Sequence, residues 1–151
     1  MINSKIFIPS FSVILVGLIG CASTKQYVPL PDQNVQIEDT TKARIYVVRP
    51  TSFGAAISMD IFDSGKHIGV TGPYGYLCWE RDTGKALVSG SSENTSTLPI
   101  AAEKGKTYYI DQGIRMGFVV ARNKLTLLDE KEGKEELKKC KKPKIENNTT
   151  K

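Results

Sequence analysis

The sequence has few of the residues from which metal and catalytic centres are built. In 151 residues there is one histidine, His67, and three cysteines, Cys21, Cys78 and Cys140. A zinc site needs three or four convergent ligands, so His67 is expected to be a surface residue, and no metal or cofactor is expected. No Gly-x-Ser-x-Gly segment occurs, which argues against a serine hydrolase of the nucleophile-elbow type.

Features of nucleotide-binding and nucleic-acid-binding proteins are also missing. The glycine-rich segment 69–76 has no Lys-Ser/Thr ending and does not lead into a helix, so it is predicted to be a turn with aromatic flanks rather than a phosphate loop. The formal net charge is +5, without a dense basic stripe in the folded part. A nucleic-acid partner is therefore not expected.

One lysine cluster stands near the end of the chain, at Lys138, Lys139, Lys141, Lys142 and Lys144. It could contact anionic lipid, lipopolysaccharide or cell-wall polymer. More often such a cluster is the solvated end of a helix, where lysines suit the negative pole.

A long apolar run opens the chain. Residues 6–20 follow Lys5 and are interrupted only by Pro9, Ser10 and Ser12. As a helix the run spans roughly 22 Å, short of the roughly 30 Å of a bilayer core. The charged-then-apolar order predicts an export signal over residues 1–20.

The run ends Leu18-Ile19-Gly20-Cys21, which resembles the lipobox of bacterial lipoproteins. The resemblance implies a diacylglyceryl group on Cys21, cleavage after Gly20, and acylation (palmitate or a similar chain) of the new amino terminus. Two acyl chains make a stable membrane anchor. Ala22 stands where an Asp would signal inner-membrane retention, so the outer membrane, facing the periplasm, is expected in a Gram-negative source. An ordinary signal peptide with a chance cysteine is the alternative.

The next residues, 21–42, are predicted to be a flexible tether. They are polar, carry Pro29 and Pro31, and contain no run able to bury a face. A docking segment that uses Tyr27, Val28 and Leu30 is the alternative. One β-rich domain is expected over residues 43–140, and residues 141–151 are predicted to be a polar basic tail.

Short alternating or β-branched runs separated by turns fill the domain, at 43–49, 56–62, 67–70, 76–80, 86–89, 95–101, 107–112, 114–121 and 124–128. They predict a mainly β fold, an antiparallel β-sandwich or partly open barrel of about seven to nine short strands. Asp63-Ser64-Gly65 predicts a tight hairpin, and residues 82–84 and 103–105 predict further turns.

A single C-terminal helix is predicted from about Glu130 to Cys140. Asp129 and Glu132 have capping-box spacing. Gly133, Leu137 and Cys140 fall on one face, which should pack on the sheet and bring Cys140 toward Cys78. With Cys21 taken by lipid, an even remainder outside the cytoplasm suggests a disulfide, worth roughly 4 kcal/mol in the chain-entropy model. Two separately buried thiols are the alternative.

Three polar residues are candidates for a site: Glu80, Glu93 and Asn94. Paired carboxylates can do acid and base work in a cleft. More often such residues form ion pairs or fix a loop, and a charged residue and an amide between two strands, as at Glu93-Asn94, often hold a connection. Tyr74, Tyr76 and Trp79 could form a carbohydrate or peptide platform, although strand aromatics are more often core.

Several segments in order resemble the bacterial lipoprotein family called domain of unknown function 2846. The resemblance covers about residues 43–140 and implies a compact β-rich envelope domain without an established activity. An Asp-Gly turn is usual in that family where this chain has Asp63-Ser64-Gly65. Residues 76–81 with Cys140 look like a cysteine-bearing branch, which supports pairing of Cys78 with Cys140. The segments are 43–50, 63–69, 93–94, 105–110 and Gly133 with Leu137.

These features together predict a membrane-anchored envelope lipoprotein with a non-enzymatic binding or scaffolding domain. Its expected partners are membrane lipid, through Cys21, and envelope proteins or cell-wall polymer. The alternatives are an envelope enzyme that acts on cell-wall or glycan material through Glu80 or Glu93, and a direct binder of peptidoglycan or lipopolysaccharide through the C-terminal lysines.

Overall fold

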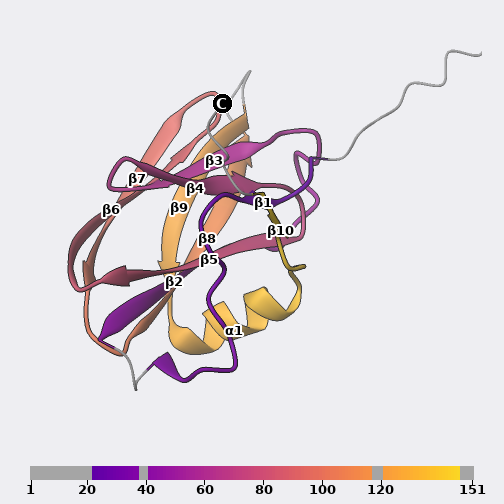
Figure 1. Ribbon diagram of the computed structural model, residues 1–151. Coiled ribbons are helices and arrows are strands. Elements are labelled where there is room, and N and C mark those ends of the chain that lie inside the picture. Colours follow the sequence, from indigo (N-terminus) through magenta and orange to yellow (C-terminus); the bar gives the residue numbers. More distant parts are fainter. Residues whose placement is uncertain (1–21, 38–40, 117–120, 147–151) are drawn as a thin grey trace, which may run out of the picture.

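The computed structural model describes residues 22–37, 41–116 and 121–146. The predicted export signal and Cys21 lie outside this part. Within it the chain forms two sheets and one helix (Figure 1). One sheet has the order β10 (Lys144–Ile145), β1 (Lys25–Gln26), β4 (Lys66–Thr71), β3 (Met59–Asp63), β6 (Gly84–Ser91) and β7 (Thr95–Ala102). The other has the order β5 (Gly75–Asp82), β2 (Lys42–Arg49), β8 (Thr107–Met116) and β9 (Ala121–Leu128), and α1 spans Glu130–Lys138.

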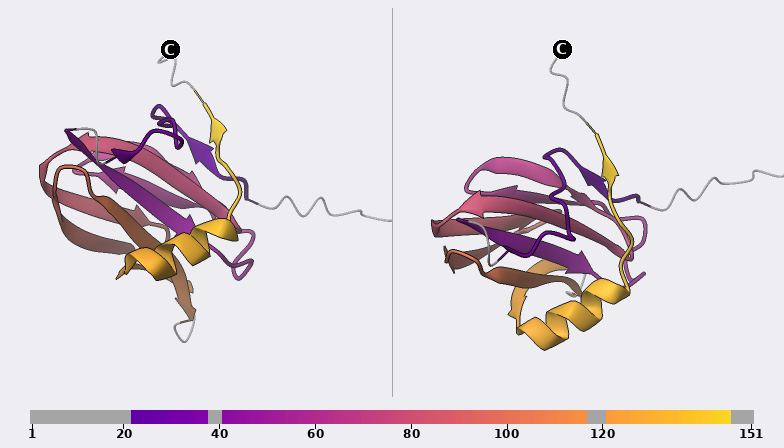
Figure 2. Two further views of the ribbon diagram at one scale, coloured as in Figure 1. Left: turned by 90° about the horizontal axis from the view of Figure 1, so that it is seen from below. Right: turned by 60° about the horizontal axis from the view of Figure 1, so that its bottom comes forward.

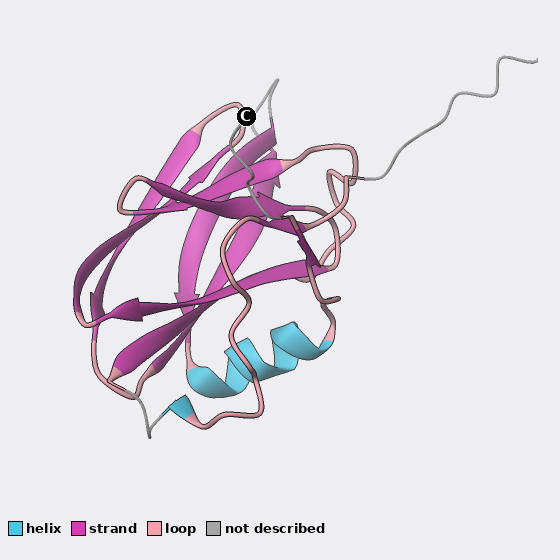
Figure 3. Ribbon diagram, viewed as in Figure 1, coloured by secondary structure: helices cyan, strands magenta, loops and turns pink. Residues whose placement is uncertain are grey.

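The predicted mainly β fold with one C-terminal helix is confirmed, and it is a sandwich rather than a closed barrel (Figure 3). The described residues form ten strands rather than the expected seven to nine, because the segments at both ends of the chain add β1 and β10. Two further details differ from the prediction. Both sheets are mixed rather than antiparallel, because β2 runs parallel to β8 and β1 runs parallel to β10. The runs expected at 107–112 and 114–121 are not two strands, because β8 continues to Met116 and β9 begins at Ala121.

Strand β2 lies at the centre of the packing because both of its faces are buried. Ile45 and Val47 face the other sheet and belong to the main core with Ile61, Val88 and Ile110. Alternation places Tyr46 and Val48 on the opposite face. A second cluster forms there under α1, and it holds Tyr46, Val48, Tyr76, Cys78 and Tyr109 with Leu137 and Cys140 packed against them. The molecule therefore has three layers, two sheets and a helix (Figure 2).

Helix α1 begins and packs as the sequence predicts. The side chain of Asp129 accepts a hydrogen bond from the Glu132 N–H at 2.8 Å, which is an N-cap bond. Gly133 faces Tyr109 so closely that a Cβ there would lie 2.2 Å from the ring. The absence of a side chain at Gly133 is what lets the helix approach the sheet.

The hairpin between β3 and β4 has a two-residue turn. Ser64 and Gly65 both have positive φ, 49° and 86°, as a type I′ turn requires. The sequence predicted this turn and the positive φ of Gly65. Ser64 reinforces the turn, because its hydroxyl donates to the Asp63 carboxylate at 3.0 Å and accepts from the Leu87 N–H.

The prediction of a flexible tether is wrong for residues 22–37. Gln26 and Ile37 are buried, Val28 belongs to the main core, and Leu30 packs against the second cluster. The alternative, a docking segment with Val28 and Leu30, describes the structure better, and its target is the domain itself. A polar segment can dock because its backbone pairs in a sheet and its apolar residues are spaced singly.

The glycine-rich segment 69–75 receives this N-terminal segment. A Cβ on Gly69 would lie 2.3 Å from the Lys25 carbonyl oxygen, and one on Gly72 would lie 2.1 Å from the Ala22 carbonyl oxygen. Gly75 has equally little space, because Thr24 occupies it. These glycines, at every third position, leave room for the incoming backbone. Their role is close approach rather than only a turn.

Gln26 joins the two sheets. Its backbone lies in β1, while its buried side chain reaches β5, the edge strand of the other sheet. The side-chain oxygen accepts from the Cys78 N–H at 2.9 Å, and the side-chain nitrogen donates to the Cys78 carbonyl at 2.7 Å and to the Val28 carbonyl at 3.1 Å. The amide thus replaces a neighbouring strand for one residue of β5.

The predicted basic tail is also partly ordered. The Lys141 N–H donates to the Tyr74 carbonyl at 2.6 Å, and β10 pairs with β1 in register Lys144 with Lys25. Glu146 forms a 3.0 Å ion pair with Lys25. The folded unit therefore extends beyond the expected limits of 43–140 at both ends.

Replacement of the buried amide tests this junction. We expect Gln26→Ala to lower the free energy of unfolding by about 2–4 kcal/mol, because the N–H and C=O of Cys78 lose their partner while remaining buried. Gln33→Ala is the matched control, since Gln33 is exposed and makes one hydrogen bond, to the Tyr76 hydroxyl; its effect should stay below about 1 kcal/mol. Urea unfolding followed by Trp79 fluorescence measures both, and equal effects would contradict the role of Gln26.

Candidate functional site

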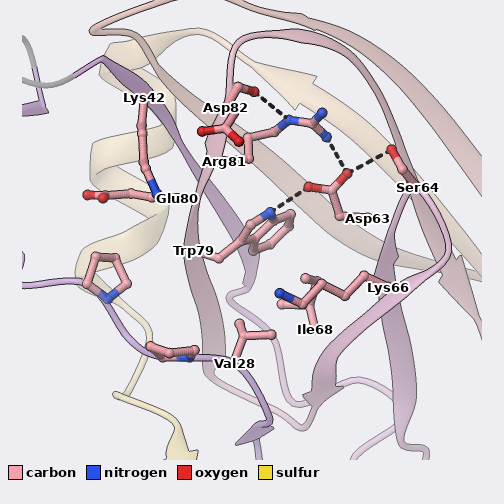
Figure 4. A pocket seen from close by; sticks show the side chains of 12 residues that line it. Val28, Lys42, Asp63, Ser64, Lys66, Ile68, Trp79, Glu80, Arg81 and Asp82 are labelled. Atoms are coloured by element: carbon pink, nitrogen blue, oxygen red, sulfur yellow. Dashed lines mark hydrogen bonds and ion pairs between the residues drawn. The ribbon is translucent and has the colours of Figure 1, made fainter.

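A pocket of about 570 Å³ lies where the N-terminal segment crosses the open side of the sandwich. Figure 4 shows its apolar floor, made by Val28, Ile68 and Trp79. The charged rim carries both signs. Its basic residues are Lys42, Lys66 and Arg81, and its acidic residues are Asp63, Glu80 and Asp82. Figure 4 shows Lys42 beside Glu80, on the side of β5 away from Asp63 and Arg81. An apolar floor with a rim of both charges suits an amphipathic or zwitterionic ligand such as a peptide segment.

The Asp63 carboxylate organises one wall of the pocket. It accepts hydrogen bonds from Trp79 Nε1 at 2.8 Å and from Ser64, and it forms an ion pair with Arg81. Arg81 also donates to the carbonyls of Asp82 and Lys85. Asp63 ends β3, whereas Trp79 and Arg81 belong to β5, so this network fixes one sheet against the other. Sequence reasoning missed it, because its members are far apart in the chain.

Glu80, a predicted candidate, points away from this network on the other side of β5 (Figure 4). Its Oε1 lies 2.7 Å from Arg44 Nη2 and 3.2 Å from Arg44 Nε. The Arg44 side chain is 6% exposed, and it also donates to the Asp32 carbonyl at 3.2 Å. Glu80 therefore balances a buried arginine, as a structural carboxylate does.

The other two candidates lie in the turn between β6 and β7. Glu93 is exposed and does not line the pocket with Glu80. The pair proposed for acid and base work is thus not brought together. Asn94 fixes a connection, as predicted: its Oδ1 accepts from the Asn123 N–H at 2.7 Å and its Nδ2 donates to the Asn123 carbonyl at 3.1 Å.

The aromatic residues do not form one platform. Trp79 is buried in the main core, whereas Tyr76 is buried in the cluster under α1. Tyr74 is exposed and belongs to neither cluster. His67, expected on the surface, is half-buried: it stacks on Phe62 and meets Tyr27 edge-on, with Nε2 2.9 Å from Asp60.

Metal-binding clusters and membrane-crossing helices are both absent from the described part of the chain. In residues 22–37, 41–116 and 121–146 there is no group of three or more His, Cys, Asp or Glu side chains arranged to hold a metal ion. In the same residues no helix has the length and apolar character needed to cross a membrane.

Cys78 and Cys140 share the cluster under α1, as the helix face predicted, but the structure holds both as free thiols. The predicted disulfide is therefore not formed in it. Each sulfur has its own partner: Cys78 interacts with the Tyr46 hydroxyl, and Cys140 Sγ donates to the Glu136 carbonyl at 3.5 Å. Burial raises the pKa of Cys78 to about 12 and that of Cys140 to about 11.

Thiol counting tests this state. In protein that carries Cys21→Ala, denatured without reductant, two thiols should react, whereas a bridge would leave none. In the native protein both should react slowly at neutral pH, because the thiolate is the nucleophile and the raised pKa values keep it scarce. Cys140, which is partly exposed, should react before Cys78. Absence of thiols in the denatured protein would overturn the free-thiol state.

Comparison with known proteins finds a relative in Haemophilus influenzae. That protein, described only as uncharacterized, is 31% identical over 140 residues, which covers 85% of this chain and 80% of that protein. No family model matches the sequence, so the resemblance to domain of unknown function 2846 stays a prediction. No solved structure matches.

Proposed function

The chain belongs to the same family as the uncharacterized protein of Haemophilus influenzae, and we propose that it is an envelope lipoprotein held on a membrane by acyl chains on Cys21. Its β-sandwich is a non-enzymatic binding or scaffolding domain, and the pocket beside Trp79 is its ligand site. In a Gram-negative cell its place is the outer membrane, facing the periplasm, because Ala22 rather than an Asp follows the cysteine.

The observation that carries the anchor is the order of residues at the start of the chain. An export signal with a lipobox requires a positive charge, then an apolar run, then a small residue before a cysteine. The chain has these in that order, as Lys5, residues 6–20 and Gly20-Cys21. Acylation at Cys21 would supply more than one chain, which is the threshold for stable membrane binding.

The binding role is supported by how the charged residues are used. Glu80 is committed to Arg44, and Asp63 is committed to Trp79 and Arg81. A carboxylate held by an ion pair or hydrogen bonds of this kind is poorly placed to exchange protons with a substrate, which favours a non-enzymatic role. The pocket they frame is of ligand size and combines an apolar floor with a polar rim.

Replacement of the lipobox cysteine tests the anchor. In wild-type cells the mature protein should begin at Cys21, carry the added mass of acyl chains and sediment with membranes. Cys21→Ser should lose the acyl mass and leave the membrane fraction after signal removal. Cys140→Ser is the control: it also replaces one cysteine by serine, but it leaves the anchor residue Cys21 in place. A wild-type mature protein without acyl mass would refute the proposal.

Crosslinking in intact cells tests the pocket. A photo-crosslinking amino acid at Lys66, on the pocket rim, should capture a defined envelope component. The same group at Lys124, an exposed position on β9, serves as the control and should not. Identical capture from both positions, or none at Lys66, would contradict a binding role for this pocket.

A further inference from the structure

The first described residue, Ala22, is bound to one end of the sandwich. Ala22 is fixed to the domain: its N–H donates to the Ala55 carbonyl at 3.1 Å, and its carbonyl oxygen fills the space beside Gly72. The neighbour of Ala22 along the chain is Cys21, the residue proposed to carry the lipid. Lipid on Cys21 would therefore leave no slack between membrane and domain.

Exposed aromatic side chains lie at this same end. Phe53, in the loop that contains Ala55, is 48% exposed, and Tyr74, two residues after Gly72, is 43% exposed. Tyr74 sits in the left-handed region, with φ of 51°, and its carbonyl accepts from the Lys141 N–H. Aromatic rings and lysines are the residues that proteins place at a membrane interface.

Arg49 binds the backbone of the Phe53 loop. Its side chain is fully buried and donates to four carbonyls, of Ile57, Thr71, Phe53 and Gly54. Within residues 22–37, 41–116 and 121–146 no carboxylate forms an ion pair with it. Burial lowers the pKa of Arg49, yet a guanidinium stays charged at physiological pH. The loop is thus arranged around a buried cation, and Phe53 is presented on a fixed backbone.

Charge at this end is nearly balanced. Lys141 and Lys142 are exposed beside Tyr74. On the other side of Phe53, Asp111, Glu132 and Glu136 line a second pocket. Burial and the two glutamates raise the pKa of Asp111, and Glu136 is paired with Lys139. Electrostatic attraction to anionic lipid is therefore weak, and contact with a membrane depends on the anchor.

We propose that this end, made of Ala22, the Phe53 loop, Tyr74 and Lys141, lies flat on the membrane that holds the acyl chains. The inference rests on the proposed lipoprotein function and gives the domain a fixed orientation. Strand β5 begins at this end with Gly75, and the pocket residues 79–82 lie at its other end. Along the strand, roughly 23 Å separate Gly75 from Asp82. The pocket then opens away from the membrane, toward the partner.

Fluorescence quenching by brominated lipid tests the orientation. The acylated mature protein is reconstituted with vesicles of phosphatidylcholine and phosphatidylglycerol, with and without bromine on the acyl chains. Phe53→Trp places a reporter at the proposed contact, and Leu87→Trp is the matched control at the opposite end, where the Ser64 N–H donates to the Leu87 carbonyl. Phe53 and Leu87 are similarly exposed, 48% and 46%. Trp79 is buried and contributes the same background fluorescence to both variants.

Bromine should quench the emission of the Phe53→Trp variant about twofold or more relative to that of the Leu87→Trp variant. Vesicles of phosphatidylcholine alone should give nearly the same ratio of quenching between the two variants, because charge contributes little to the contact. Equal quenching of both variants, or none of Phe53→Trp, overturns the orientation. Flotation of the vesicles separates the two hypotheses. Protein that floats without quenching of Phe53→Trp removes only this inference, whereas protein that does not float removes the anchor, and the orientation with it.

Discussion

The unpaired backbone groups along the two outer strands of the four-stranded sheet are the constraint that shapes this fold. An exposed strand edge invites pairing with other chains and leaves polar groups to be desolvated as the sandwich closes. At the β5 edge, Gln26 binds the N–H and C=O of Cys78. At the β9 edge, Asn94 does the same for Asn123, and Ser96 accepts from the Leu125 N–H. Polar side chains from the six-stranded sheet and its connections thus satisfy backbone groups at both edges of the four-stranded sheet.

Two buried arginines show how charge is used in this molecule. Arg44 is balanced by Glu80, whereas Arg49 donates to four backbone carbonyls and forms no ion pair within the part of the chain that the structure describes. Breaking a buried pair costs more than the pair contributes, so such residues define a single arrangement as much as they stabilise it. Glu80 and Asn94, two of the site candidates in the sequence, also have structural roles: Glu80 pairs with Arg44, and Asn94 binds the backbone of Asn123. What remains open to other molecules is the pocket surface and the exposed aromatic end.

Local features of the fold follow from the sequence, and long-range ones do not. The β-branched run at 43–49 predicts a strand, and so does the alternation along 95–101, where one face lies toward a core. Asp129 predicts the helix start because its carboxylate reaches a free N–H. The parallel pairing of β2 with β8 leaves no local trace. Burial of Gln26 could not be predicted either, because it depends on an edge residue 52 positions away. The glycines at 69, 72 and 75 were the available signal, since their regular spacing marks a place where another segment lies close.

Strand β1 has a consequence for the order of folding. It is among the first parts of the domain to be made, yet its partners are β4 at residues 69–70 and β10 at residues 144–145. Contacts between such distant segments form late, because the intervening chain must first be confined. During synthesis β1 must therefore wait at least until β4 has been made before it can pair in the sheet. In that interval Gln26 is unbound and the β5 edge is open to pairing with other chains.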